Sequence, residues 1–286
     1  MGIAAVLVIA AAPARSAAQT TPGSPAVTVS AGYEPHRDRL HYGFENPSTI
    51  DTPFLVPHRF DQTYVADNQW FLLSVRYPVF GEFMKTEVSL TPERATFASD
   101  LDTFFDPDND LVVSGTAGDV MMRSWQVAHW SEARLWGQLW RLGYVFRRDV
   151  TEFRSTERLL THSNPASASR TPINTHETTI SSVQEIPFGV SKQIAVARGW
   201  VLTAGTDVAP VATARLTTIL PEKYPGQEIV FEATIATLAA RAQVDWVRQR
   251  WPLTLMVEYG RTWSYRSSNQ FGRDSLKAGV RFGLVR

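Results

Sequence analysis

The sequence predicts an all-β protein, a single antiparallel transmembrane β-barrel of about ten strands with long outward loops and short periplasmic turns. Three observations predict this fold. Apolar and polar residues alternate over runs of 11 to 14 residues, long and short connections follow one another in turn, and no uncharged run of about 18 apolar residues follows the N-terminus. Because a barrel hides its lipid face by alternation, the mean hydropathy of −0.16 is compatible with a membrane protein.

The N-terminus has the features of a signal peptide over residues 1–18. Ile3 to Ala12 is an apolar run too short to span a bilayer, and Ser16, Ala17 and Ala18 are the small residues that a signal peptidase reads. We therefore expect cleavage after Ala18 and a barrel domain over residues 19–286. No Lys or Arg precedes the apolar run, so a disordered Ala-rich tail stays open as the alternative.

The rest of the chain divides into strands joined by connections of alternating length. Short turns on one side and long loops on the other are the pattern of outer-membrane barrels. Short turns are expected at Pro78–Gly81, Gly137–Gln138, Gly189–Gln193 and Arg248–Pro252, and long loops at 46–57, 98–118, 155–174, 217–228 and 267–273. These connections predict ten strands, over residues 30–45, 58–77, 82–97, 119–136, 139–154, 174–188, 194–216, 229–247, 252–266 and 274–286.

The C-terminal third carries the clearest alternation. Within 253–266, Leu255 and Val257 fall on one face, and polar or charged residues fall on the other. Residues 236–246 and 274–286 repeat the pattern, which suits a dry exterior around a wet interior. A soluble sandwich alternates too, with its apolar face inside, but its strands usually have only about 5–6 residues.

Residues 121–142 are rich in tryptophan and fit two secondary structures. The spacing of Trp125, Trp136 and Trp140 also suits a helix. We favour two strands because Gly137 interrupts a helix, and because the alternation of long and short connections then holds. The helix stays open as the alternative.

Composition excludes several functions. The 28 basic and 28 acidic residues cancel, which gives no support for nucleic-acid binding, and the absence of cysteine excludes disulfides and thiolate sites. No zinc, phosphate-binding or nucleophile motif occurs, so we expect no metal and no cofactor. His162 and His176 lie in or beside the third long loop, within reach of the barrel mouth, although a plain surface position is the simpler interpretation.

The densest acidic cluster begins with Asp100 and Asp102, where a strand gives way to the second long loop. Residues two apart on an extended chain point to the same face, so both carboxylates can meet at the mouth and orient a water or share a proton. The following Asp106, Asp108 and Asp110 are oxygen-rich enough for Ca²⁺, but the EF-hand Gly and closing Glu are missing. The alternative is a solvated turn of Asp, Asn and Pro without a catalytic or binding role.

The Asp-x-Asp pair, the length and the ten-strand layout resemble the omptins, a family of outer-membrane barrel proteases. Omptins carry such a pair at the start of the second outward loop, where Asp100 and Asp102 lie. Glu87-Val-Ser-Leu resembles the family's third strand, and Gln184-Glu-Ile-Pro-Phe-Gly resembles the segment before the third periplasmic turn. The resemblance implies a bacterial outer-membrane location and an aspartic endopeptidase that takes a peptide or protein substrate.

The fourth outward loop departs from the omptin pattern. The resemblance implies an Asp-x-His pair there to activate the attacking water, and loop order places this pair on Pro221 and Lys223. Proline has no ionisable group, and lysine is protonated at neutral pH. Glu222 is therefore the candidate catalytic carboxylate beside Asp100 and Asp102, without a general-base histidine.

Four arginines in and after the predicted fifth strand are candidates for lipid recognition. Omptins bind lipopolysaccharide through outward basic residues, and guanidinium groups suit phosphate. The resemblance thus implies lipopolysaccharide contact here, and salt bridges with neighbouring carboxylates are the alternative. The four residues are Arg147, Arg148, Arg154 and Arg158.

Three functions remain for a narrow barrel of this kind. The first is an omptin-type endopeptidase with an altered site. The second is a non-catalytic omptin-like barrel that binds or adheres at the cell surface, and the third is a narrow channel or structural barrel. The lysine at position 223 favours the second over the first, and the Asp100–Asp102 pair favours the first over the third.

Overall fold

The structure is a computed structural model that describes residues 27–46, 58–80, 82–105, 111–162, 168–222, 224–246, 251–265 and 269–285. The predicted signal peptide lies outside these residues. None of the described residues forms a helix long and apolar enough to span a membrane. The described chain is all-β, with the strands β1 Thr28–Asn46, β2 His58–Val79, β3 Glu82–Phe105, β4 Leu111–Leu135, β5 Gln138–His162, β6 Ser169–Glu185, β7 Phe188–Ala197, β8 Trp200–Ile219, β9 Glu228–Trp246, β10 Leu253–Ser264 and β11 Gln270–Val285.

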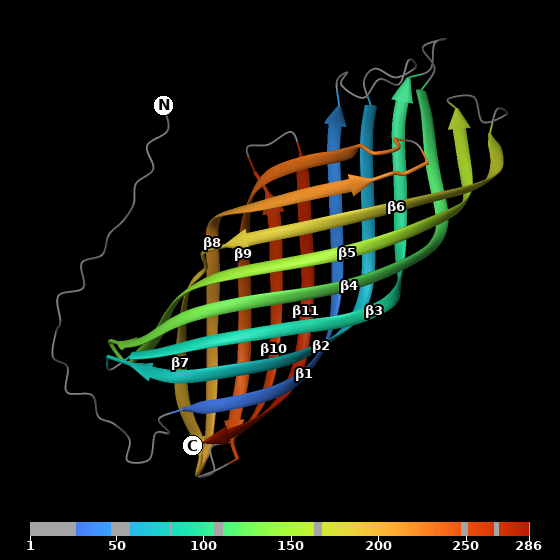
Figure 1. Ribbon diagram of the computed structural model, residues 1–286. Coiled ribbons are helices and arrows are strands. Elements are labelled where there is room, and N and C mark those ends of the chain that lie inside the picture. The colour runs from blue at the N-terminus through green and yellow to red at the C-terminus, as the bar shows by residue number, and fades with distance from the viewer. Residues whose placement is uncertain are drawn as a thin grey trace, which may run out of the picture.

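The strands close into an antiparallel ring of ten positions. Each strand pairs with its neighbour in the order β4-β3-β2-β1-β11-β10-β9-β8-β6-β5, and a β4–β5 pairing closes the ring. In Figure 1 the strands of the near and far walls cross steeply, as tilted barrel strands do. The barrel predicted from alternation is therefore confirmed.

Strands β6 and β7 share the tenth position end to end. Both pair with β5 in one register, because Glu185 lies opposite Val145 and Phe188 lies opposite Leu142. The strand is interrupted at Pro187, whose nitrogen has no hydrogen to donate to a ladder. Eleven segments therefore make ten barrel strands.

One predicted turn is wrong. Residues 189–193 lie inside β7, and the chain reverses at Arg198–Gly199, where Gly199 has φ 78°. Gly189 suggested a turn, but its role is in packing, because a Cβ there would collide with the Asp207 carboxylate. The turn at Gly137 lies where predicted, so the helix considered for residues 121–142 is excluded.

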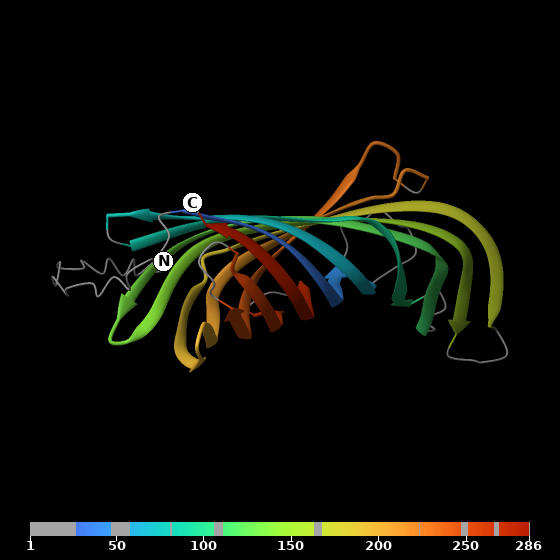
Figure 2. The same cartoon turned by 90° about the horizontal axis from the view of Figure 1, so that it is seen from below.

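The strands continue into two predicted loops. The loop predicted for 98–118 is mostly the ends of β3 and β4, and the loop predicted for 155–174 is mostly the ends of β5 and β6. Backbone pairing there continues beyond the lipid-facing residues, so the barrel wall extends outward. Figure 2 shows these long strands as a curved wall, from which the β8–β9 hairpin rises away.

The outer face of the ring is apolar. Large exposed hydrophobic side chains come from every position of the ring, as a lipid-facing band requires. They include Val29, Tyr33, Phe71, Leu73, Val88, Leu90, Trp125, Leu142, Tyr144, Ile194, Val208, Leu238, Leu255, Val257, Leu276, Phe282 and Leu284.

Aromatic and charged residues mark the two limits of this band. Near the short turns, Trp200 stacks on Trp246 with ring centroids 6.0 Å apart, and Trp140 lies 5.5 Å from Phe188. Towards the outward end, exposed ion pairs begin, with Arg261 3.7 Å from Asp274 on β10 and β11, and further pairs on other strands. Interfacial aromatics and then charges are the expected sequence of groups at a membrane surface.

The interior has polar and apolar layers. An apolar cluster that includes Leu40, Tyr64, Met122, Phe153 and Ile235 is buried in the outward half. The predicted wet interior is therefore right for the half near the short turns and wrong for this layer. Side chains fill a barrel of this width.

Candidate functional site

The candidate site at the barrel mouth contains Asp100 in a row of residues across four strands. Gln62 on β2 lies opposite Asp100 on β3, which lies opposite Thr116 on β4, which lies opposite Arg158 on β5. Directly opposed residues of antiparallel strands share a face. Gln62 and Asp100 are buried, so the row faces the interior.

Asp100 is held firmly in this row. The Thr116 hydroxyl donates a hydrogen bond to Asp100 Oδ2 at 2.5 Å. The backbone of Asp102 lies in register with Phe60 and Ser114, but its side chain, like the predicted loop aspartates 106, 108 and 110, lies outside the described residues. The structure therefore places one of the two predicted carboxylates at the mouth.

A hydrogen-bond network crosses the mouth. Gln62 Nε2 on β2 donates to Glu177 Oε1 on β6 at 2.7 Å, and Tyr64 donates to Gln62 Oε1 at 2.9 Å. Thr179 also donates to Glu177 Oε1, at 2.8 Å. Three ring positions separate β2 from β6 on the shorter path, so the network spans the interior. Gln62 lies opposite Asp100, so the network and the row of Asp100 share this residue.

Glu222 pairs with a histidine from another strand. His176 Nδ1 lies 2.8 Å from Glu222 Oε1, and the His176 backbone N–H donates to Oε2 at 3.0 Å. These hydrogen bonds from His176 hold the pKa of Glu222 below its ordinary value of 4.5. Both side chains are exposed, whereas the next residue, Glu177, is buried in the interior.

The alternation of β6 separates this pair from Asp100. Neighbouring residues of a strand point to opposite faces, so His176 points away from the interior that Glu177 and Asp100 face. The structure thus joins Glu222 to a histidine, but not in the row that contains Asp100. Both residues are predicted near the mouth from the sequence, but their contact is not, because it depends on the pairing of β6 with β8.

The four predicted lipid-binding arginines divide between the two faces of β5. Arg147 is buried in the interior, where it contacts Asp38 at 2.5 Å and Asp149 at 3.0 Å, so the prediction of outward lipid contact is wrong for it. Arg158 faces inward in the row of Asp100. Alternation places Arg148 and Arg154 on the outer face, and Arg154 is exposed there.

A charged layer deeper in the barrel was not predicted. Arg147 on β5 binds Asp38 on β1, and Arg273 on β11 binds Asp149 on β5, directly across the ring. Ser124 also donates to Asp149, at 2.6 Å. In the sequence, charged residues occur at alternate positions of a strand, as Arg147 and Asp149 do, but this spacing does not identify their partners on other strands.

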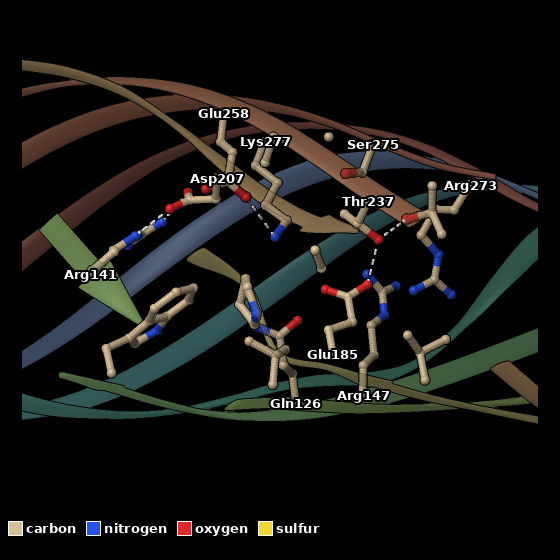
Figure 3. Close-up of a pocket in the computed structure, with 18 of the residues that line it drawn as sticks. Gln126, Arg141, Arg147, Glu185, Asp207, Thr237, Glu258, Arg273, Ser275 and Lys277 are labelled. Atoms are coloured by element: carbon tan, nitrogen blue, oxygen red, sulfur yellow. Dashed lines mark hydrogen bonds and ion pairs between the residues drawn. The ribbon is translucent and has the colours of Figure 1, made fainter. Parts of the chain in front are cut away.

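Around this layer lies a cavity of about 120 Å³. Figure 3 shows Arg147 and Arg273 side by side near Glu185 at one end, and the Arg141–Asp207 and Lys277–Glu258 contacts at the other. The cavity is polar and large enough for ordered water. No cluster of three or more histidine and carboxylate groups suited to a metal occurs in the described part of the chain.

Comparisons with known proteins identify the fold. No family model matches the chain, and no curated protein sequence matches it. Among solved structures, the outer membrane protease OmpT from Escherichia coli is similar over 93% of this chain and 98% of its own, with a TM-score of 0.63 at 6% identity.

Other barrels are less similar. The translocator domain of the autotransporter NalP from Neisseria meningitidis covers 92% of this chain and 90% of its own, at 12% identity and a TM-score of 0.34. The Ail protein of Yersinia pestis covers 90% and 97%, at 12% identity and a TM-score of 0.26. The closed ring, its apolar outer face and the OmpT likeness together show an outer-membrane β-barrel, and the protein belongs in the bacterial outer membrane.

Proposed function

We propose that the chain is a sealed barrel of omptin type that binds a peptide or protein at its outward mouth. The observation that carries this proposal is the closure of the interior. Side chains from distant ring positions meet across the lumen at two heights, through Gln62 with Glu177 and through the pairs made by Arg147 and Arg273. An apolar cluster lies in the same interior, so passage of a solute is disfavoured.

We therefore place binding at the mouth, where the ends of the strands extend beyond the lipid-facing band. Loops and strand ends on a rigid scaffold are the usual positions of binding residues. The mouth row and the Gln62–Glu177 network present carboxylate, amide and hydroxyl groups in fixed positions. Ordered groups of this kind suit the recognition of a polar chain without a large entropic cost.

An omptin-type endopeptidase is the second candidate. It is favoured by the position of Asp100 at the mouth and by the similarity of the whole barrel to OmpT. It is disfavoured because the described residues place no histidine in the row of Asp100, and a general base must come within hydrogen-bond reach of the water that it activates. Fold similarity alone does not bring activity.

Lipopolysaccharide contact is proposed for the outer face of β5 only. Arg148 and Arg154 point outward, and Arg154 lies opposite His176 and Asp119 on the neighbouring strands. Arg154 lies beyond the apolar band, where its guanidinium group would meet the phosphates of an anionic headgroup, whereas Arg148 lies opposite Trp125 within the band.

The test uses the barrel refolded in detergent with lipopolysaccharide and a set of fluorescein-labelled extended peptides, with and without paired basic residues. We expect binding, seen as raised fluorescence anisotropy, without cleavage by mass spectrometry between pH 5 and 9. Glu177→Gln should weaken binding by roughly tenfold or more, since hydrogen bonds to charged groups contribute about 1.5–3 kcal/mol. Glu152→Gln, which alters an exposed pair with Arg123, should leave binding unchanged.

Cleavage that Asp100→Asn abolishes would establish the endopeptidase instead. A folded barrel that neither binds nor cleaves any peptide would contradict both proposals.

A further inference from the structure

Arg241 on β9 is a lumen-facing cation near the short-turn end of the barrel, five residues before β9 ends at Trp246. It lies opposite Gly205 on β8 and opposite Glu258 on β10, which in turn lies opposite Lys277 on β11. The row therefore contains one carboxylate, Glu258, between two cations, Arg241 and Lys277.

The carboxylates around Arg241 are engaged elsewhere. Glu258 lies 3.1 Å from Lys277 Nζ, and Asp207 binds Arg141 through both oxygens. Among the described residues, no carboxylate comes within ion-pair distance of Arg241, and its buried Nε has no hydrogen-bond partner. A guanidinium group has five N–H donors, and the Nε donor of Arg241 is buried without an acceptor.

A second guanidinium group, that of Arg141 on β5, lines the same space as Arg241. Arg141 is fixed by its pair with Asp207 and by packing 4.0 Å over the Trp130 ring, so it does not turn away. Two guanidinium groups in one low-dielectric space repel each other unless an acceptor lies between them.

The space beside these two arginines is a cavity of about 90 Å³. Five Lys and Arg side chains line it against three Glu side chains, so its lining carries a net charge of +2. Even when Asp207 is counted against Arg141, one positive charge remains. The cavity is large enough for an ion with water.

We propose that this cavity binds a small inorganic anion between the guanidinium groups of Arg241 and Arg141. Chloride and phosphate share the required chemistry, because both accept charge-assisted hydrogen bonds from guanidinium. The anion completes the charge balance of the lumen near its short-turn end. The site is separate from the mouth, so its test is independent of the test of peptide binding.

The first test is diffraction from crystals of the unmodified barrel grown in sodium bromide. We expect an anomalous peak within hydrogen-bond distance of Arg241, and a position occupied by water without anomalous signal would overturn the proposal. This arm needs no variant, so it holds even if a lumen substitution prevents folding.

The second test measures chloride in solution. The refolded protein should broaden the ³⁵Cl resonance, and added phosphate or bromide should reverse the broadening by competition. Arg241→Gln should lose the broadening, while Arg261→Gln, at an exposed outer-face arginine 3.7 Å from Asp274, should retain it. Equal broadening by the unmodified protein and Arg241→Gln, or phosphate and bromide without effect, would reject the site.

Discussion

At the scale of single residues, one step along a strand decides the role of a charge. Arg147 is buried against Asp38 and Asp149, while Arg148 points to the outer face. The residue types alone suggested one basic patch, and alternation along β5 divides it. An interior charge in such a barrel needs a partner, because a buried unpaired charge is costly.

Asp149 should be the most sensitive of these interior groups. It accepts hydrogen bonds from Ser124 and Arg147 and also binds Arg273. Asp149→Asn leaves two buried guanidinium groups short of their counter-charge, and we expect a loss of about 3–5 kcal/mol in the free energy of unfolding. Urea unfolding in lipid vesicles, followed by tryptophan fluorescence, measures it. Glu232→Gln, at an exposed pair 3.9 Å from Arg215, is the control and should change stability by at most about 1 kcal/mol.

The Glu222–His176 contact should respond to acid. Hydrogen bonds from His176 lower the folded-state pKa of Glu222 below 4.5, so its contribution is fully present above that value. The contribution is lost as the pH falls through the lowered folded-state pKa. A ¹³C titration of the Glu222 carboxyl should give a midpoint below 4.5, and His176→Ala should return it towards 4.5. A midpoint that His176→Ala leaves unchanged would show that the contact is absent in solution.

At the scale of elements, the sequence predicted best where alternation was unbroken. The faces predicted within 238–246 and 253–264 are those observed, with Leu255 and Val257 exposed on the outer face. Prediction failed at β7, because Gly189 marks a close approach of Asp207 rather than a reversal of the chain. Strand length was underestimated because polar residues beyond the lipid band look like loop, although their backbones still pair.

A charge on the lipid face should be costly in proportion to its depth. Val257 lies within the apolar band, whereas Val230 lies near the start of β9 at the outward end. Val257→Arg should destabilise the barrel by about 2–4 kcal/mol and Val230→Arg by about 0–1 kcal/mol. Equilibrium unfolding in vesicles gives both values, and equal costs at the two positions would contradict the proposed placement of the membrane.

At the scale of the whole molecule, closure of the ring creates contacts that no local pattern contains. β1 pairs with β11, which joins the two ends of the described chain. The Arg147–Asp38 and Arg273–Asp149 contacts join residues 109 and 124 positions apart. The mouth network and the surplus cation at Arg241 likewise depend on which strands face each other across the lumen. The sequence predicted the barrel and the place of Asp100, but these interior partners follow only from the closed ring.

A barrel that is sealed and acts at its mouth should not conduct ions, and ionic conductance across a planar bilayer measures this. The protein should be inserted from detergent with lipopolysaccharide, and its folding should be confirmed by heat-modifiable gel migration. We expect no stable current steps over the range of applied voltage, because paired side chains and an apolar cluster fill the lumen. Reproducible ohmic steps from the folded, unmodified protein would show an open path through the barrel and would exclude a sealed lumen.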